Sequence, residues 1–313
     1  MQPNQPITTV PAAPVVPQGS EPAQNIGRIK RGWLLTQSAW HVFKLDKELT
    51  ALPVLGFFAS VVAIVPFVTA FILLGGVGTN DESMNPAQWV LFVALYMLLT
   101  FIGNFFAGAV ISGAMTRFQG GDPTVKSSMA AVKQRLKPLA LYSLMMGTVG
   151  LILQIIEDRV PLGGKIATWI VGATWNIANF FALPIIVLSP KTDVAPLTAT
   201  KQSIGMVKQV WGESVVANVS ISIISVLVMI GYMLIGSILT FAAGATLGVV
   251  GAIVVGSLLG LGLIAIALVT SVLSGIVKAA LFHYATTGKA PETFNQELMR
   301  TAMTSKKARK MFA

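Results

Sequence analysis

The stretch "ALPVLGFFASVVAIVPFVTAFILLG", from Ala51 to Gly75, decides the fold class of this chain. It contains no charged residue, and a helix of about 20 apolar residues is long enough to cross a hydrocarbon layer of about 30 Å. Pro66 lies inside the stretch and predicts a kink, which neighbouring helices of a bundle can accommodate. We therefore expect a transmembrane helix over residues 51–75.

The composition extends this prediction to the whole chain. Hydrophobic residues make up 54% of the 313 residues and charged residues 11%, against about 25% charged in an average globular protein. We therefore predict an all-α polytopic membrane protein with six transmembrane helices. Five further apolar stretches predict spans at about 89–115, 139–156, 166–189, 215–241 and 252–284.

The last apolar block, from Ala245 to Tyr284, is too long for one perpendicular crossing at 1.5 Å per residue. We predict a turn around Gly244 to Gly251, followed by one long tilted helix. The alternative is a re-entrant segment between Gly244 and Gly256.

The basic residues predict the orientation of the spans. Six spans place both termini on one side of the membrane, and all but Arg159 and Lys165 of the 22 lysines and arginines fall on that side. Cytoplasmic loops are enriched in lysine and arginine. We therefore expect cytoplasmic N- and C-termini and a location in the cytoplasmic membrane.

Two terminal segments flank the membrane domain, which we place at residues 27–290. Residues 1–26 hold six of the 16 prolines and no apolar core, which predicts a disordered, proline-rich tail. Residues 291–313 form a basic, amphipathic cytoplasmic segment that includes "SKKARK" at 305–310.

Three short cytoplasmic segments resemble one another and predict an internal repeat. "SAWHVFK" begins at Ser38, "SMAAVKQ" at Ser128 and "SIGMVKQ" at Ser203, each just before an odd-numbered span. A proline follows each even-numbered span, at Pro123, Pro196 and Pro291. The predicted unit is a cytoplasmic helix followed by two spans, repeated three times.

The sequence pattern of the cytoplasmic segments predicts interfacial amphipathic helices. Val125, Met129, Val132 and Leu136 form one apolar stripe, which we expect to face the acyl boundary. We expect five lysines to reach anionic headgroups: Lys126, Lys133, Lys137, Lys201 and Lys208. The alternative is that these lysines only set the topology. The expected interfacial anchors are Trp33, Trp40 and Trp211.

Neutral polar residues near the middle of the even-numbered spans are the candidate ligand-binding positions: Asn104, Asn176, Asn179 and Ser271. They predict either a polar cavity for a headgroup or small solute, or hydrogen bonds between helices. No ionisable residue lies deep in a span. Lys278 is the nearest, and its side chain is long enough to reach the interface.

Enzyme signatures are missing from the sequence. The chain has no cysteine and only two histidines, and "GGVG" at Gly75 is not followed by the GK[ST] of a phosphate-binding loop. Carboxylate pairs occur only in short external loops, without a neighbouring base. We expect no enzyme activity, no cofactor, no metal and no nucleic-acid partner.

The stretch "IGRIKRGWLLTQSAWHVFKLDKEL", with "RFQGGDPT" from Arg117, "WGES" from Trp211 and "ALFHYATTGKAP" from Ala280, resembles an uncharacterised family of prokaryotic six-span membrane proteins. That family opens with a similar R-x-x-R-G-W…S-x-x-x-V…D-K-E-L pattern. The resemblance implies the same topology and no activity. More loosely, the arrangement is similar to the membrane domain of some glycerophosphodiester phosphodiesterases, whose catalytic domain this chain lacks.

These observations predict a non-enzymatic membrane protein that organises the bilayer or interacts with lipid, or an accessory subunit of a complex. Its expected partner is the lipid bilayer, with anionic lipids at the collar of basic helices. The alternative function is a permease-like carrier of a small or lipidic solute.

Overall fold

The computed structural model describes residues 28–74, 85–211, 215–296 and 299. The described residues form helices and no strand. These helices are α1 (Arg28–Leu45), α2 (Lys47–Leu73), α3 (Pro86–Phe118), α4 (Val125–Lys133), α5 (Leu136–Arg159), α6 (Leu162–Ala178), α7 (Ala182–Leu188), α8 (Pro196–Trp211) and α9 (Val215–Thr287).

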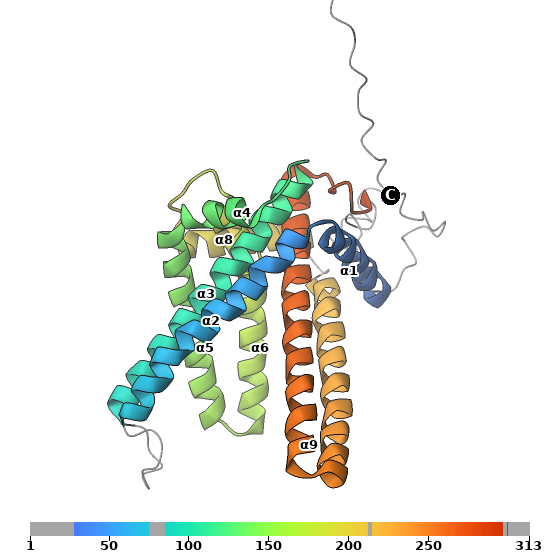
Figure 1. Cartoon of the computed structure of the whole chain (residues 1–313). Coiled ribbons are helices and arrows are strands. Elements are labelled where there is room, and N and C mark those ends of the chain that lie inside the picture. Colours follow the sequence, from blue (N-terminus) through green and yellow to red (C-terminus); the bar gives the residue numbers. More distant parts are fainter. Residues whose placement is uncertain (1–27, 75–84, 212–214, 297–298, 300–313) are drawn as a thin grey trace, which may run out of the picture.

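The long helices form three hairpins (Figure 1). Helix α2 lies along α3, and α5 lies along α6. Helix α9 reverses its direction at Gly248, where φ is 69°, a conformation that glycine adopts without the clash of a Cβ atom. Its two legs then run antiparallel, and the Tyr232 hydroxyl donates to the Leu259 carbonyl oxygen at 3.1 Å.

The reversal of α9 lies where the sequence predicted a turn. Gly248 falls inside the predicted segment Gly244 to Gly251, and the chain continues beyond it as a helix to Thr287. The re-entrant alternative placed irregular backbone as far as Gly256, which instead lies within the second leg of α9.

Five helical stretches are long and apolar enough to cross a membrane. They overlap the predicted spans, with the fifth and sixth both contained in α9 and the fifth included only from Val228 onward. The stretches are Lys47–Leu73, Pro86–Phe118, Leu136–Arg159, Gly163–Leu188 and Val228–Thr287.

The predicted fourth span at 166–189 is interrupted, which the sequence analysis missed. Helix α6 ends at Ala178 and α7 begins at Ala182. Pro184 has no N–H and its ring crowds the carbonyl four residues earlier, which disfavours a continuous helix through this point. The Phe181 N–H donates to Ser203 Oγ of α8 at 2.9 Å, so a side chain accepts the bond where the helix is broken.

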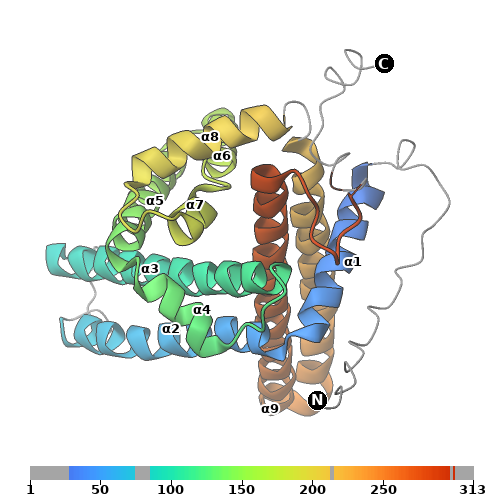
Figure 2. The same cartoon turned by 90° about the horizontal axis from the view of Figure 1, so that it is seen from above.

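Helices α1, α4 and α8 gather towards the end of the bundle opposite the Gly248 turn (Figures 1 and 2). We call these three helices, together with the first turn of α5, the collar, and this end of the molecule the collar end. The end that contains Gly248 and the α5–α6 connection at Val160 is the distal end. Seen from above, the collar helices lie across the hairpins (Figure 2).

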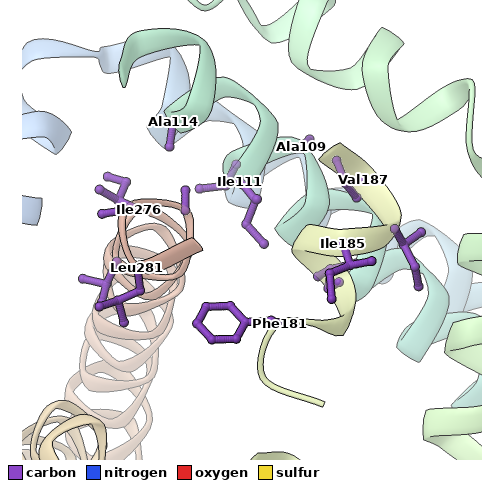
Figure 3. Close-up of a cluster of buried hydrophobic side chains, with 14 of the residues drawn as sticks. Ala109, Ile111, Ala114, Phe181, Ile185, Val187, Ile276 and Leu281 are labelled. Carbon is purple, nitrogen blue, oxygen red and sulfur yellow. The ribbon is translucent and has the colours of Figure 1, made fainter. Parts of the chain in front are cut away.

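The buried core lies near the collar end, where α3, α7 and the second leg of α9 meet (Figure 3). Ile111, Phe181, Ile186, Ile276 and Leu281 are at most 1% exposed. The distal halves of the hairpins instead expose large apolar side chains, among them Val62, Trp169 and Phe241. Such apolar surface is suited to contact with lipid tails.

Candidate lipid-facing collar and pocket

The five lysines predicted to face lipid are all exposed. Lys126 and Lys133 lie on α4, Lys137 in the first turn of α5, and Lys201 and Lys208 on α8. The fold thus gathers these charges from three separate helices near the collar end.

The apolar stripe of α4 faces protein, which corrects the prediction that it faces the acyl boundary. Val132 is fully buried, and Val125 and Met129 pack against the core. Gly108 of α3 lies at this contact: an added Cβ atom would touch a Val132 methyl group at an ordinary 3.5 Å, and would lie 3.0 Å from Val187 Cγ2 of α7. The stripe also ends earlier than expected, since α4 stops at Lys133 and Leu136 is exposed on α5.

Helix α8 shows a similar arrangement. Val207 and Ser203 are buried, and α8 packs mainly against α7. Leu197, at the start of the helix, is 64% exposed. The inner face of α8 therefore contacts protein, while Lys201 and Lys208 remain on its outer surface.

Helix α1 has one face on the bundle and one face outward. Leu35 and Val42 are buried, whereas Trp33 and Trp40 are 50% and 40% exposed. The two exposed tryptophans are therefore free to contact surrounding lipid. The third predicted anchor, Trp211, ends α8, and its side chain lies outside the described part of the structure.

An ion pair joins the start of α2 to the end of α3. Asp46 immediately precedes α2, and its side chain is 4% exposed. Arg117 Nε donates to Asp46 Oδ2 at 2.6 Å, and Arg117 Nη2 donates to Asp46 Oδ1. Arg117 Nη2 also lies 3.1 Å from Asp122 Oδ1. A bidentate pairing of this kind fixes both the distance and the orientation of the two groups.

Glu48 makes a second connection from the same segment. Its Oε2 accepts from the Val125 N–H at 2.7 Å, at the start of α4. A carboxylate at a helix N-terminus is favoured by the helix dipole. The "DKEL" and "RFQGGDPT" stretches, noted separately in the sequence, thus meet in one hydrogen-bonded junction between α2, α3 and α4.

The predicted mid-membrane polar residues lie in different surroundings. Asn104 Nδ2 of α3 donates to Ser143 Oγ of α5 at 3.0 Å. Asn179 is buried after the end of α6, and its Oδ1 accepts from Thr200 Oγ1 of α8 at 2.7 Å. The other two predicted residues are exposed: Asn176 and Ser271.

A cavity of about 630 Å³ opens near the collar end, between α3, α7, α8 and α9. None of the four predicted polar residues lines it. Its polar lining includes Ser112, Thr116, Gln202, His283, Thr286 and Thr287. Its apolar lining includes Met115, Ile185, Leu188 and Phe282.

The sequence analysis missed this cavity, because its lining comes from segments far apart in the chain. The predicted repeat contained one signal that could have indicated the cavity. Met115, Leu188 and His283 each lie eight residues before the proline that follows an even-numbered span, at Pro123, Pro196 and Pro291. All three line the cavity.

Lys278 lies on α9, about one turn closer to the distal end than the α9 residues that line the cavity. Its Nζ is 5.7 Å from the centroid of the Phe180 ring, at the interruption between α6 and α7. The structure thus places this ammonium group against an aromatic face, a contact favoured by the ring quadrupole.

Comparison with known proteins supports the assignment to an uncharacterised group. No curated protein and no solved structure matches the chain. Residues 87–292, well over half of the chain, match a family described as "Family of unknown function (DUF6159)". The match begins after the "DKEL" stretch, so the N-terminal pattern lies outside it, and the looser similarity to phosphodiesterase membrane domains stays a prediction. The chain belongs to this family of unknown function.

Proposed function

We propose that this chain is a six-span protein of the cytoplasmic membrane that binds anionic lipids through its collar and thereby organises the surrounding bilayer. The observation that carries the proposal is the exposure of Lys126, Lys133, Lys137, Lys201 and Lys208 near one end of an otherwise apolar bundle. Each basic residue near an anionic membrane surface contributes about 1 kcal/mol to attraction. The proposal assigns no catalytic step to the chain.

The number of spans follows in this proposal from the shape of α9. Four of the membrane-length stretches precede it, and the reversal at Gly248 divides the fifth into two antiparallel legs. Six crossings place both termini on the same side. The excess of lysine and arginine around the collar makes that side cytoplasmic.

The packing of the collar supports the threefold repeat. Helix α4 makes most of its contacts with α3, and α8 makes more with α7 than with any other element. Helix α1 makes most of its contacts with α9. Helix α4 thus packs on a span of the first predicted repeat, α8 on a span of the second, and α1 on α9 of the third, the arrangement expected if the three repeats close into a ring.

The permease-like alternative is less well supported. It relied on a shared polar cavity formed by Asn104, Asn176, Asn179 and Ser271. Two of these side chains make hydrogen bonds between helices, and the other two are exposed. Hydrogen bonds between helices therefore account for Asn104 and Asn179 without a ligand.

Native mass spectrometry of the full chain, extracted with its lipids, tests the lipid proposal. The test variant changes Lys126, Lys133, Lys137, Lys201 and Lys208 to Gln. Its control changes Arg159 and Lys165, the basic residues near the distal end, to Gln. We expect the wild type and the control to retain phosphatidylglycerol or cardiolipin, and the test variant to lose it. Equal retention in all three proteins would contradict the proposal.

Single cysteines test the orientation, because the chain contains none. We expect Lys165→Cys to react with a membrane-impermeant maleimide in right-side-out vesicles. Lys133→Cys is expected to react only in inverted vesicles. The opposite pattern would place the collar outside the cell.

A further inference from the structure

We propose that the cavity at the collar end binds a neutral polyhydroxyl group, either a free polyol or sugar, or the polyol headgroup of a lipid. This site is separate from the collar lysines and does not depend on their binding anionic lipid. The proposal rests on three observations: the size of the cavity, the lack of formally charged side chains among the described residues that line it, and the hydrogen bonds that its hydroxyl groups donate to the backbone.

The size and composition of the cavity fit a small ligand. Its volume of about 630 Å³ lies within the range of about 300–1,000 Å³ that is usual for small-molecule sites. Apolar side chains such as Met115, Ile185 and Phe282 alternate with hydroxyl, amide and imidazole groups. This mixture suits a ligand that carries hydroxyl groups on a carbon skeleton.

The charge of the lining side chains also limits which ligands fit the cavity. Among the residues that the structure describes, no aspartate, glutamate, lysine or arginine lines the cavity. A cationic ligand would lack a carboxylate partner there, and a phosphate or carboxylate ligand would lack a lysine or arginine. Within the described part of the lining, His283 is the single ionisable side chain.

The hydroxyl groups of α3 and α9 are arranged to accept hydrogen bonds. Thr116 Oγ1 donates to the Ser112 carbonyl oxygen at 3.1 Å, and Thr286 Oγ1 donates to the Phe282 carbonyl oxygen at 2.9 Å. Thr287 Oγ1 donates to the His283 carbonyl oxygen at 2.7 Å. With the proton of each hydroxyl directed to the backbone, the oxygen lone pairs of Thr116 and Thr286 remain for a ligand. Thr287 Oγ1 also accepts from the Lys289 N–H at 3.2 Å.

The Gln202 side chain supplies the complementary groups. Its amide carries two N–H donors and one carbonyl acceptor, and it extends into the cavity lining from α8. The lining therefore offers several acceptors together with some donors. A polyol satisfies both kinds of group at once, because each hydroxyl donates one hydrogen bond and accepts others.

The repeat places a different residue at one equivalent position. Three residues lie eight positions before the proline that follows an even-numbered span. Two of them, Met115 and Leu188, are apolar, whereas the third is His283. A cavity that only filled space between three similar helices would need no imidazole there. His283 therefore adds a polar group to the lining at a position where the other two predicted repeats have apolar side chains.

Saturation-transfer NMR on the full chain in phosphatidylcholine nanodiscs tests the proposal. The free probes are glycerol, myo-inositol and glucose at millimolar concentration. The lipid-borne probe is dihexanoylphosphatidylglycerol, compared with dihexanoylphosphatidic acid, which has the phosphate without the polyol. We expect saturable binding of at least one free polyol, or of the phosphatidylglycerol in preference to the phosphatidic acid. The first result identifies a free ligand and the second a lipid headgroup.

Two exposed lining residues provide the test variant, Gln202→Leu with Thr286→Val. Loss of two hydrogen-bonding groups is expected to weaken binding about ten-fold or more. The matched control is Gln154→Leu with Thr246→Val, which removes the same groups from exposed positions away from the cavity. The proposal would be overturned if no free polyol bound saturably and the two phospholipids bound equally, or if both variants lost binding to the same extent.

Discussion

The collar half and the distal half of this molecule are held together in different ways. In the collar half, close-packed side chains, the Glu48–Val125 hydrogen bond and the Asp46–Arg117 pair join segments far apart in the sequence. In the distal half, the same helices expose large apolar side chains such as Trp169, at 72%, and Phe241, at 80%. One half is organised by protein contacts, and the other presents a surface for lipid.

The difference shows where the fold is specified. Lipid tails are as apolar as leucine, so burying apolar side chains between helices gains little inside a bilayer. Polar pairs and close helix contacts discriminate between arrangements, and the described structure concentrates them near the collar. We therefore expect substitutions in the collar half to affect stability more than matched substitutions in the distal half.

The largest effect is expected from Arg117→Ala. It leaves the Asp46 carboxylate, 4% exposed, without its partner, and breaking a buried pair in this way costs about 3–5 kcal/mol. Arg159→Ala, at the distal end of α5, removes an exposed arginine and should change stability by about 0.5 kcal/mol or less. Unfolding by SDS titration measures both variants. Equal losses of stability in the two variants would show that the ion pair does not stabilise the collar half.

A smaller effect is expected from Gly275→Val. A Cβ atom at Gly275 would lie 2.6 Å from Val110 Cγ1, where α9 crosses α3. Overpacking at such a contact costs about 1–3 kcal/mol. Gly260, on the same leg of α9, has no atom within 4 Å of an added Cβ, so Gly260→Val serves as the control. Thermal unfolding in nanodiscs should separate the two variants, and an equally stable Gly275→Val protein would contradict the close packing.

The smallest effect is expected from Asn104→Leu. It removes the hydrogen bond to Ser143, and such bonds between membrane helices contribute about 0.6–2 kcal/mol. Asn176→Leu changes an exposed amide on α6 to an apolar side chain, so its stability should stay the same or rise. The same SDS titration compares them. A larger loss in Asn176→Leu would indicate that this residue has a partner in the assembled protein.

The sequence predicted the elements of the fold well, because a membrane imposes a length and an apolar composition on each crossing. The predicted spans at 51–75, 89–115 and 139–156 lie largely or wholly within α2, α3 and α5. The turn in the last apolar block was also predicted, from length and from its glycines. The interruption at 179–181 was missed, since hydropathy is the same in a continuous and a broken helix.

The candidate sites were predicted less completely. The five lysines are exposed because they are charged, and this holds whichever helices lie next to them. The stripe of Val125, Met129 and Val132 was assigned to lipid, whereas it packs on α3. A helical wheel shows that one face is apolar, but a neighbouring helix and a lipid tail satisfy that face equally well.

The sequence by itself determined which segments are apolar enough to enter a membrane and where the charges lie, because both are properties of local composition. The tertiary structure alone decided which segments meet. Asp46 and Arg117 are 71 residues apart, and the cavity is lined by helices from all three predicted repeats. Such contacts depend on how the hairpins pack in space, and no local pattern of residues carries that information.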